Sequence, residues 1–301
     1  MFPTLFLGSF SVSVYHVIFS VAVCVGLFLF WRAARYELIE SNLAFDLTVV
    51  GISGALIFGR VMEFVLDSER FLWSPARLFF FNVYSGFDLW GAILGGSLFV
   101  LIFLRSRKVN FWQIFDLAAA PVVFAQVLVA FGNFARGSLG GFVALYYAFS
   151  YLVIFWILKR LEKQRKHLGF FACFYLVAIS LLDIVLFRWR DDVVYIGNVI
   201  PRQLGLPLLF LIFGLVCWWR LAKRNLKGDF KIIFAQVLLV IMGTKRVLTS
   251  FDEAGKFSRF LILVPYWFVI FLAGFVKMVG REIVLTASDL LYILGVKKLS
   301  K

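Results

Sequence analysis

Several polar residues stand where long apolar stretches begin or end, and their types could handle a phosphate ester. Arg60 follows Gly59 inside an apolar run, and a guanidinium can bond one phosphate through two donors at once. His16, beside Tyr15, could accept a proton near neutral pH. The same positions in other stretches hold amides, tyrosines, acids and arginines: Glu63, Asp88, Asn133, Arg136, Tyr146, Tyr147, Asp183, Arg188, Arg190, Arg202 and Gln203.

Each of these residues also has a structural explanation. Polar side chains at the ends of membrane helices commonly reach toward the lipid–water interface. Arg60 could be neutralised by Asp88 or Asp183 instead of a phosphate, and Glu63 has the i,i+3 spacing of an intrahelical partner for Arg60. His16 could equally be a buried, hydrogen-bonded imidazole. The cluster as a whole therefore carries more weight than any one member.

Glycines gather in two stretches among these polar residues. They are GFDLWGAILGG at residues 86–96 and FGNFARGSLGG at residues 131–141. Glycine lets helices approach closely and lets backbone N–H groups face an anion. Helix packing explains the GxxxG spacing of Gly91 and Gly95 well, but a polar, glycine-rich turn at a membrane surface needs partners for its hydrogen bonds.

Apolar stretches of helical length must position these residues. Of the 301 residues, 62% are hydrophobic and only 16% charged, which excludes an ordinary soluble domain. A membrane helix needs about 20 predominantly apolar residues. The sequence therefore predicts an all-α, polytopic transmembrane helix bundle with seven core helices, near residues 11–31, 45–66, 86–104, 111–134, 141–158, 169–187 and 199–219.

The remaining chain predicts one or two extra helices, so that residues 1–223 form a seven-helix membrane domain and residues 224–301 a C-terminal extension. The candidate spans in the extension are residues 230–243 and 259–276, and residues 277–301 have the pattern of an interfacial amphipathic segment. These extra helices could form an interface with another membrane protein or simply pack on the bundle.

The basic residues predict the orientation. Lys and Arg total 31 against 17 Asp and Glu, and they concentrate in the loops after the first, third, fifth and seventh predicted helices. Short basic loops stay cytoplasmic, so the N-terminus is expected outside, with the polar cluster on the extracytoplasmic side. The first residues lack a basic region and a cleavage site, so we expect them to be retained. Nucleic acid is not expected as a partner, because the basic residues lie between apolar runs, where they orient helices and contact anionic lipid. A metal site is not expected, because Cys24, Cys173 and Cys217 lie singly in apolar runs, and no cofactor is expected.

The order of these motifs resembles the prolipoprotein diacylglyceryl transferase family. A Tyr at the head of the first helix is followed by GR in the second, a glycine-rich start to the third, GNF closing the fourth, LY opening the fifth and QxxxP opening the seventh. The resemblance covers roughly residues 11–223, and its most specific piece runs from VNFWQIFD to GNFARGSLGG. It implies transfer of diacylglyceryl from phosphatidylglycerol, or another anionic phospholipid, to the lipobox cysteine thiol of a prolipoprotein signal peptide at the bacterial inner membrane.

The resemblance also implies site residues. Carried over by position, Arg60 would hold phosphate, while Tyr15 and Asn133 would orient the donor head group. Other residues could replace those that have changed: His16 is a candidate base, and Arg136, Arg188 or Arg190 is a candidate second cation. The expected catalytic residues are thus Tyr15, His16, Asn133 and Arg136, and the expected substrate-binding residues are Arg60, Gly86, Trp90, Gly91, Gly137, Gly141, Tyr146, Arg190 and Gln203.

Some positions depart from the family pattern. Trp90 stands where the family usually has His, Ala130 where it has Arg before GNF, and Asp183 where an Arg of the sixth helix is expected. The segment after GNF is also much shortened. Two functions follow: a diacylglyceryl transferase with a rebuilt set of catalytic residues, or a catalytically degenerate relative that binds phospholipid or a partner protein.

Overall fold

A computed structural model shows how the helices are arranged. The chain forms two compact units, Met1–Lys223 and Arg224–Lys301. The structure describes residues 5–7, 10–80, 86–107, 109–137, 142–190, 193–196 and 200–223, and in the second unit residues 266, 269–270, 272–274, 276–282, 284–289 and 291.

The first unit contains seven α-helices, which confirms the expected all-α bundle. They are α1 (Val14–Tyr36), α2 (Ser41–Leu66), α3 (Leu89–Leu104), α4 (Phe111–Arg136), α5 (Phe142–Leu161), α6 (Phe170–Leu186) and α7 (Arg202–Leu221). Six of them are long and apolar enough to cross a membrane, while α3 has 16 residues. The third helix begins three residues later than predicted because Gly86 has a φ of +142° and Asp88 caps the helix.

Two short antiparallel hairpins precede α1 and α7. Strand β1 (Leu5–Leu7) pairs with β2 (Phe10–Val12), and β3 (Tyr195–Ile196) pairs with β4 (Ile200–Pro201). The apolar periodicity did not predict either hairpin, because strands of two or three residues leave no pattern in the sequence. Short 3-10 turns at Pro75–Phe79, Glu162–Gln164 and Phe187–Trp189 complete the elements.

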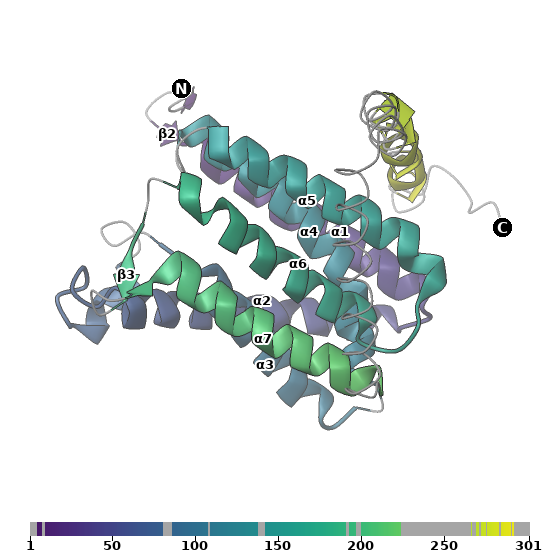
Figure 1. Ribbon diagram of the computed structural model, residues 1–301, viewed down its shortest axis with the longest axis horizontal. Helices are drawn as coiled ribbons and strands as arrows, with labels where there is room; N and C mark the ends of the chain where they lie inside the picture. Colours follow the sequence, from purple (N-terminus) through teal and green to yellow (C-terminus); the bar gives the residue numbers. More distant parts are fainter. Residues whose placement is uncertain are drawn as a thin grey trace, which may run out of the picture. The chain divides into compact units, whose positions relative to one another are not determined.

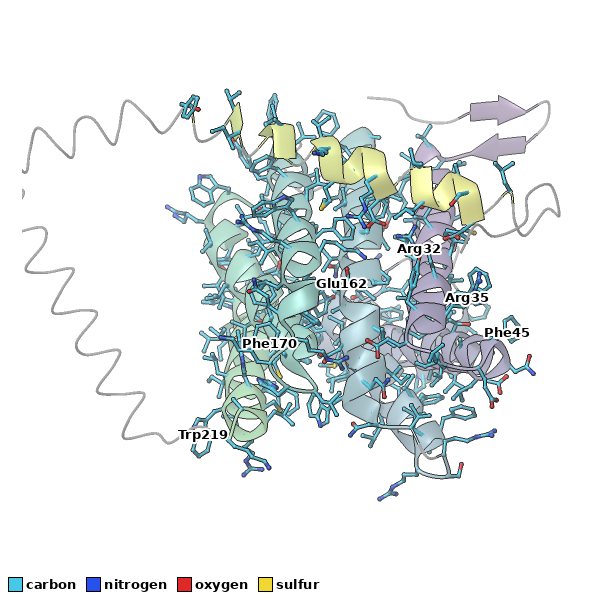
Figure 2. All side chains as sticks on the ribbon, turned by 90° about the vertical axis from the view of Figure 1, so that its right-hand side faces the viewer. Arg32, Arg35, Phe45, Glu162, Phe170 and Trp219 are labelled. Carbon is cyan, nitrogen blue, oxygen red and sulfur yellow. The ribbon has the colours of Figure 1, made fainter. Side chains whose placement is uncertain are left out.

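The helices lie alongside one another. Helices α1, α4 and α5 form one group, α2 packs on α3, and α6 contacts α4 and α5 on one side and α7 on the other (Figure 1). Side chains project along the full length of the helices, and Phe45, at the margin of the bundle, is 66% exposed (Figure 2). A soluble protein rarely exposes so much apolar surface. The chain is a multi-pass membrane protein whose outward faces are matched to lipid.

Glycines allow α2 and α3 to pack closely. A methyl group on Gly54 would lie 2.5 Å from the carbonyl oxygen of Gly95, and one on Gly95 would overlap Phe58. A methyl group on Gly91 would lie 2.8 Å from the Phe58 carbonyl oxygen. Because apolar side chains gain little by leaving lipid, this close backbone contact is what holds the pair together.

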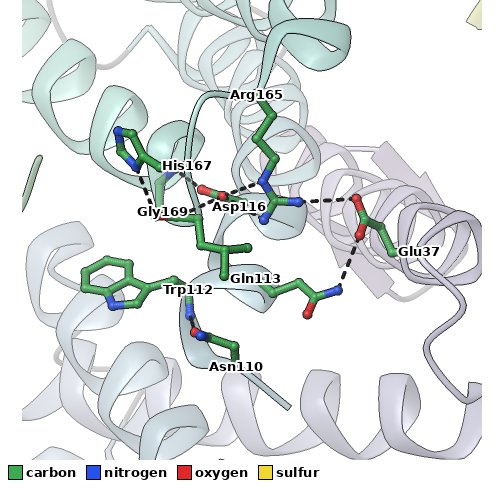
Figure 3. Close-up of polar contacts among 10 residues, drawn as sticks. Glu37, Asn110, Trp112, Gln113, Asp116, Arg165, His167 and Gly169 are labelled. Atoms are coloured by element: carbon green, nitrogen blue, oxygen red, sulfur yellow. Dashed lines mark hydrogen bonds and ion pairs between the residues drawn. The ribbon is translucent and has the colours of Figure 1, made fainter. Parts of the chain in front are cut away.

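A carboxylate supplies the missing N-terminal cap of α6. The helix begins after Gly169, which has a φ of +85° and no side chain to cap the first turn. Asp116 of α4 acts in its place: its Oδ2 accepts a hydrogen bond from the Gly169 amide at 2.7 Å, and its Oδ1 accepts one from the Ala172 amide at 2.9 Å (Figure 3). Asp116 therefore joins two helices that are 53 residues apart in the chain.

Arg165 extends this contact to α1. Its Nε donates to Asp116 at 3.1 Å, its Nη1 donates to Glu37 at 3.3 Å, and Gln113 also donates to Glu37 (Figure 3). We call this end of the bundle the Asp116 end. The opposite end, where α2 finishes and α3 and α7 begin, is called the Arg60 end.

In the second unit, the described residues 266, 269–270, 272–274, 276–282, 284–289 and 291 are helical. The predicted span at residues 230–243 lies outside the described residues, as does most of the predicted span at 259–276.

Replacing Gly95 with Ala is expected to lower the unfolding temperature in detergent micelles, because overpacking a tight contact costs about 1–3 kcal/mol. Gly280→Ala is the control, since a methyl group there meets nothing within 4 Å. Equal stability of the two variants would show that the α2–α3 contact is loose.

Asp116→Ala is expected to destabilise the bundle by about 0.5–2 kcal/mol through loss of the α6 cap. Asp116→Asn keeps one acceptor oxygen and should lose less. Thermal unfolding in micelles measures both, with Glu162→Ala as the acidic control because Glu162 is paired only at the surface with Lys159. A loss no larger than that of the control would contradict the capping role.

Candidate active site

Arg60 lies near the end of α2 with 4% of its surface exposed. Its Nε donates to the Leu78 carbonyl at 3.0 Å, and its Nη1 donates to the Gly86 carbonyl at 3.0 Å. The guanidinium also lies over the Phe71 ring, 4.9 Å from its centroid. These contacts hold the side chain in one place and tie the segment before α3 to α2.

A buried ion cluster lies beside Arg60. Arg202, the first residue of α7, donates to Glu63 of α2 and, through its Nη2, to Oδ2 of Asp88 at 2.7 Å. The second oxygen of Asp88 accepts from the Gly91 amide at 2.6 Å and caps α3. One guanidinium thus joins the ends of three helices.

The cluster resolves which acids the arginines bind. The sequence left open an ion pair of Arg60 with Asp88 or Asp183, and it favoured Glu63 as a partner of Arg60. In the structure Asp88 binds Arg202, and Glu63 binds Arg202 with Arg70 3.7 Å away; Glu63 also lies close enough to Arg60 for their charges to interact. The cluster contains three arginines, Arg60, Arg70 and Arg202, and two acids, Glu63 and Asp88. It therefore has one excess positive charge, which suits an anionic ligand.

A second polar group lies between α3, α5 and α6. The Asp183 carboxylate, 8% exposed, accepts hydrogen bonds from the side chains of Tyr147 and Trp90. The Nη1 of Arg190 lies 3.5 Å from the Tyr147 hydroxyl oxygen, to which it donates. The Trp90 ring stacks on Phe210 of α7 with 4.6 Å between centroids. Trp90 and Asp183, at the positions where the resemblance predicts His and Arg, therefore contact each other.

A third group joins the start of α1 to the end of α4. The Arg136 guanidinium lies 5.5 Å from the centroid of the Tyr15 ring, and the His16 ring meets that of Tyr15 edge-on at 5.6 Å. A methyl group on Gly132 would lie 3.2 Å from Tyr15, so the helices are close here. Gly137, with a φ of +73°, ends α4, and its amide donates to the Asn133 carbonyl. His16 itself is exposed on the helix surface.

The other expected site residues take different positions. A methyl group on Gly86 would lie 2.8 Å from Oε1 of Glu63, so this glycine is needed beside the ion cluster. Gln203 accepts a hydrogen bond from the Val194 amide at 3.2 Å and holds the loop before α7. Tyr146 is 57% exposed on the outside of α5. Gly141 lies outside the described residues.

Tyr147, like Glu63, Asp88, Asp183 and Arg202, belongs to the predicted polar cluster but not to the expected site residues. Its neighbour Tyr146 points outward, whereas Tyr147 is 4% exposed. The helical period could have separated the two, because the buried face of α5 repeats every three or four residues: Val143, Ala144, Tyr147, Ala148, Tyr151, Ile154, Phe155 and Leu158.

Within the described residues, no group of three or more His, Cys, Asp and Glu side chains is placed to hold a metal ion. The polar side chains described at the Arg60 end are mainly arginines, carboxylates and hydroxyls. Such a set binds and neutralises a phosphate ester and moves protons.

Comparison with known proteins assigns a family to this arrangement. The profile of the prolipoprotein diacylglyceryl transferase family matches residues 3–220. Proteins named phosphatidylglycerol–prolipoprotein diacylglyceryl transferase from Synechococcus elongatus and Halalkalibacterium halodurans are each 25% identical to this chain. Each alignment covers 74% of this chain, with 89% of the first protein and 86% of the second. A protein of the same name from Bacillus cereus is 27% identical over 42% of this chain and 47% of its own length.

Arg202→Met is expected to destabilise the bundle by about 3–5 kcal/mol, because it leaves two buried carboxylates without their shared cation. Adding Glu63→Gln and Asp88→Asn to it removes the uncompensated charges and should restore part of the loss. Thermal unfolding in micelles compares the single and triple variants. A triple variant less stable than Arg202→Met would contradict this account of the cluster.

Proposed function

Because the chain belongs to the prolipoprotein diacylglyceryl transferase family, we propose that it transfers the diacylglyceryl group of phosphatidylglycerol to the thiol of a lipobox cysteine in a prolipoprotein signal peptide. The observation that carries this proposal is the family match over residues 3–220, which span the seven helices, and it is supported by the buried Arg60 near the end of α2. The relatives compared above bear the name of this activity.

The arrangement at the Arg60 end supports such chemistry. In the transfer, the cysteine sulfur bonds to the terminal glycerol carbon, the bond from that carbon to the phosphate oxygen breaks, and glycerol phosphate leaves. Negative charge on the leaving phosphate needs nearby cations, and Arg60 and Arg190 are candidates to supply them. Asn133 and Tyr15 are proposed to orient the head group from the α1–α4 side.

We place the Arg60 end on the extracytoplasmic side of a bacterial plasma membrane. The distribution of basic residues supports this orientation, because short loops rich in Lys and Arg stay cytoplasmic. The loops and helix ends at the Asp116 end carry Arg32, Arg35, Arg105, Arg107, Lys159, Arg160, Arg165 and Lys166.

A second candidate function is phospholipid binding without transfer. The observation that favours it is Trp90, which fills the position where the resemblance places a His and is packed against Phe210. An indole N–H is only a donor and cannot accept a proton. A binder needs the cationic surroundings of Arg60 but no proton acceptor.

The test is to incubate the purified protein in phosphatidylglycerol bilayers with a lipobox peptide and to follow the peptide mass. A diacylglyceryl mass gain is expected, and Arg60→Ala should slow it by about 10²–10³-fold, since it removes a group that stabilises transition-state charge. Arg60→Lys keeps the charge but not the two-donor geometry, so it should fall between Ala and wild type.

Arg35→Ala is the matched control, because Arg35 lies at the Asp116 end beside Trp31. No mass gain by the folded wild-type protein, with an active transferase run in parallel, would reject transfer in favour of the binding function. Equal rates for Arg60→Ala and Arg35→Ala would reject the role of Arg60.

A further inference from the structure

The buried carboxylates at the Arg60 end have different partners. Glu63 and Asp88 are bound by the Arg202 guanidinium. Asp183 instead accepts hydrogen bonds from two neutral side chains, Tyr147 and Trp90. A carboxylate fixed by a guanidinium is a poor proton acceptor, because its charge is already compensated by a neighbour that cannot lose a proton.

The charged groups around Asp183 come from several elements. Arg190, from the segment after α6, is a nearby cation, and Asp88 is a nearby anion. The hydroxyls of Tyr151 and Tyr175 lie close enough to sense the Asp183 charge. The Tyr147 hydroxyl lies between two of these groups: it hydrogen-bonds to Asp183, and its oxygen lies 3.5 Å from the Nη1 of Arg190.

We propose that Tyr147 and Asp183 form the proton relay that activates the substrate thiol, an inference that rests on the proposed function. Tyr147 accepts the thiol proton on its oxygen while its own proton passes to Asp183. The sulfur then bonds to the glycerol carbon as the bond from that carbon to the phosphate oxygen breaks with its electrons on oxygen. Asp183 returns the proton to the departing phosphate, so that protons and charge balance over the cycle.

The structure favours this pair over the other candidates for the base. His16 lies on the exposed surface of α1 and contacts the Tyr15 ring. Trp90 cannot accept a proton, and its contact with Asp183 makes it a positioning residue for the carboxylate. Arg190, which donates to Tyr147, is placed to neutralise the phosphate beside the relay.

The relay is tested with Asp183→Asn and Tyr147→Phe in phosphatidylglycerol bilayers with a lipobox peptide. Each variant should slow transfer by about 10²–10⁴-fold, the usual contribution of a positioned acid or base. Tyr36→Phe and Glu162→Gln, both exposed and remote from the Arg60 end, are the controls and should keep the wild-type rate.

A pH series separates a relay from a structural role. A free cysteine thiol has a pKa of about 8.5, so its ionised fraction rises nearly tenfold per pH unit below that value. Without the relay, transfer should depend on this fraction, and the rate of each variant relative to wild type should rise by about tenfold from pH 7 to pH 8. A variant that is impaired only through misfolding would show a constant ratio.

The outcomes are distinct. The relay is overturned if the wild type is active and both Asp183→Asn and Tyr147→Phe transfer at rates within threefold of the wild-type rate. It is also overturned if the ratio of variant rate to wild-type rate does not change with pH. In either case the transferase function stands. An inactive wild type overturns both. Should Asp183→Asn fail to fold, the pH dependence of Tyr147→Phe decides, and partial activity of Asp183→Glu supports the relay.

Discussion

Burial of charge in an apolar bundle is the constraint on which this structure depends. Lipid offers no water to solvate an ion, so each buried charge must be met by another part of the protein. At the Arg60 end, Arg202 forms ion pairs with Glu63 and Asp88. At the Asp116 end, Asp116 accepts hydrogen bonds from the first amides of α6 and forms an ion pair with Arg165. Both contacts join helices that are distant in the chain. Polar contacts thus fix the two ends of the bundle, while glycine contacts and apolar side chains fill its length.

The same constraint shapes the site. Arg60 is held by two backbone carbonyls from the segment before α3, so its position follows from the geometry of that segment. Arg202 in turn fixes the start of α3 through Asp88. The residues that stabilise the helix ends therefore also set where a phosphate could be bound. In the proposed function, support and binding therefore depend on the same few arginines and acids at this end.

The sequence predicted the seven helices because a membrane span must be a long apolar run, and such runs are visible without any structure. It could not predict the exact start of α3, which depends on the cap at Asp88, or the partners of the arginines. Arg202 binds acids that are 139 and 114 residues away in the chain, and nothing local marks such a pair. The LY motif points to Tyr146 by position alone, whereas helical periodicity decides that Tyr147 is the tyrosine that faces inward.

The contact between Trp90 and Asp183 bears on how the departures from the family pattern are to be understood. Taken one at a time, a Trp in place of His removes a base, and an Asp in place of Arg removes a cation. In the structure the indole and the carboxylate are partners, so the two changes amount to one new polar contact. Asp183 also accepts a hydrogen bond from Tyr147, whose hydroxyl oxygen lies 3.5 Å from the Nη1 of Arg190. A carboxylate, a hydroxyl and a guanidinium in a row are the groups that a thiol and a phosphate ester require, and they come from α6, α5 and the segment that follows α6.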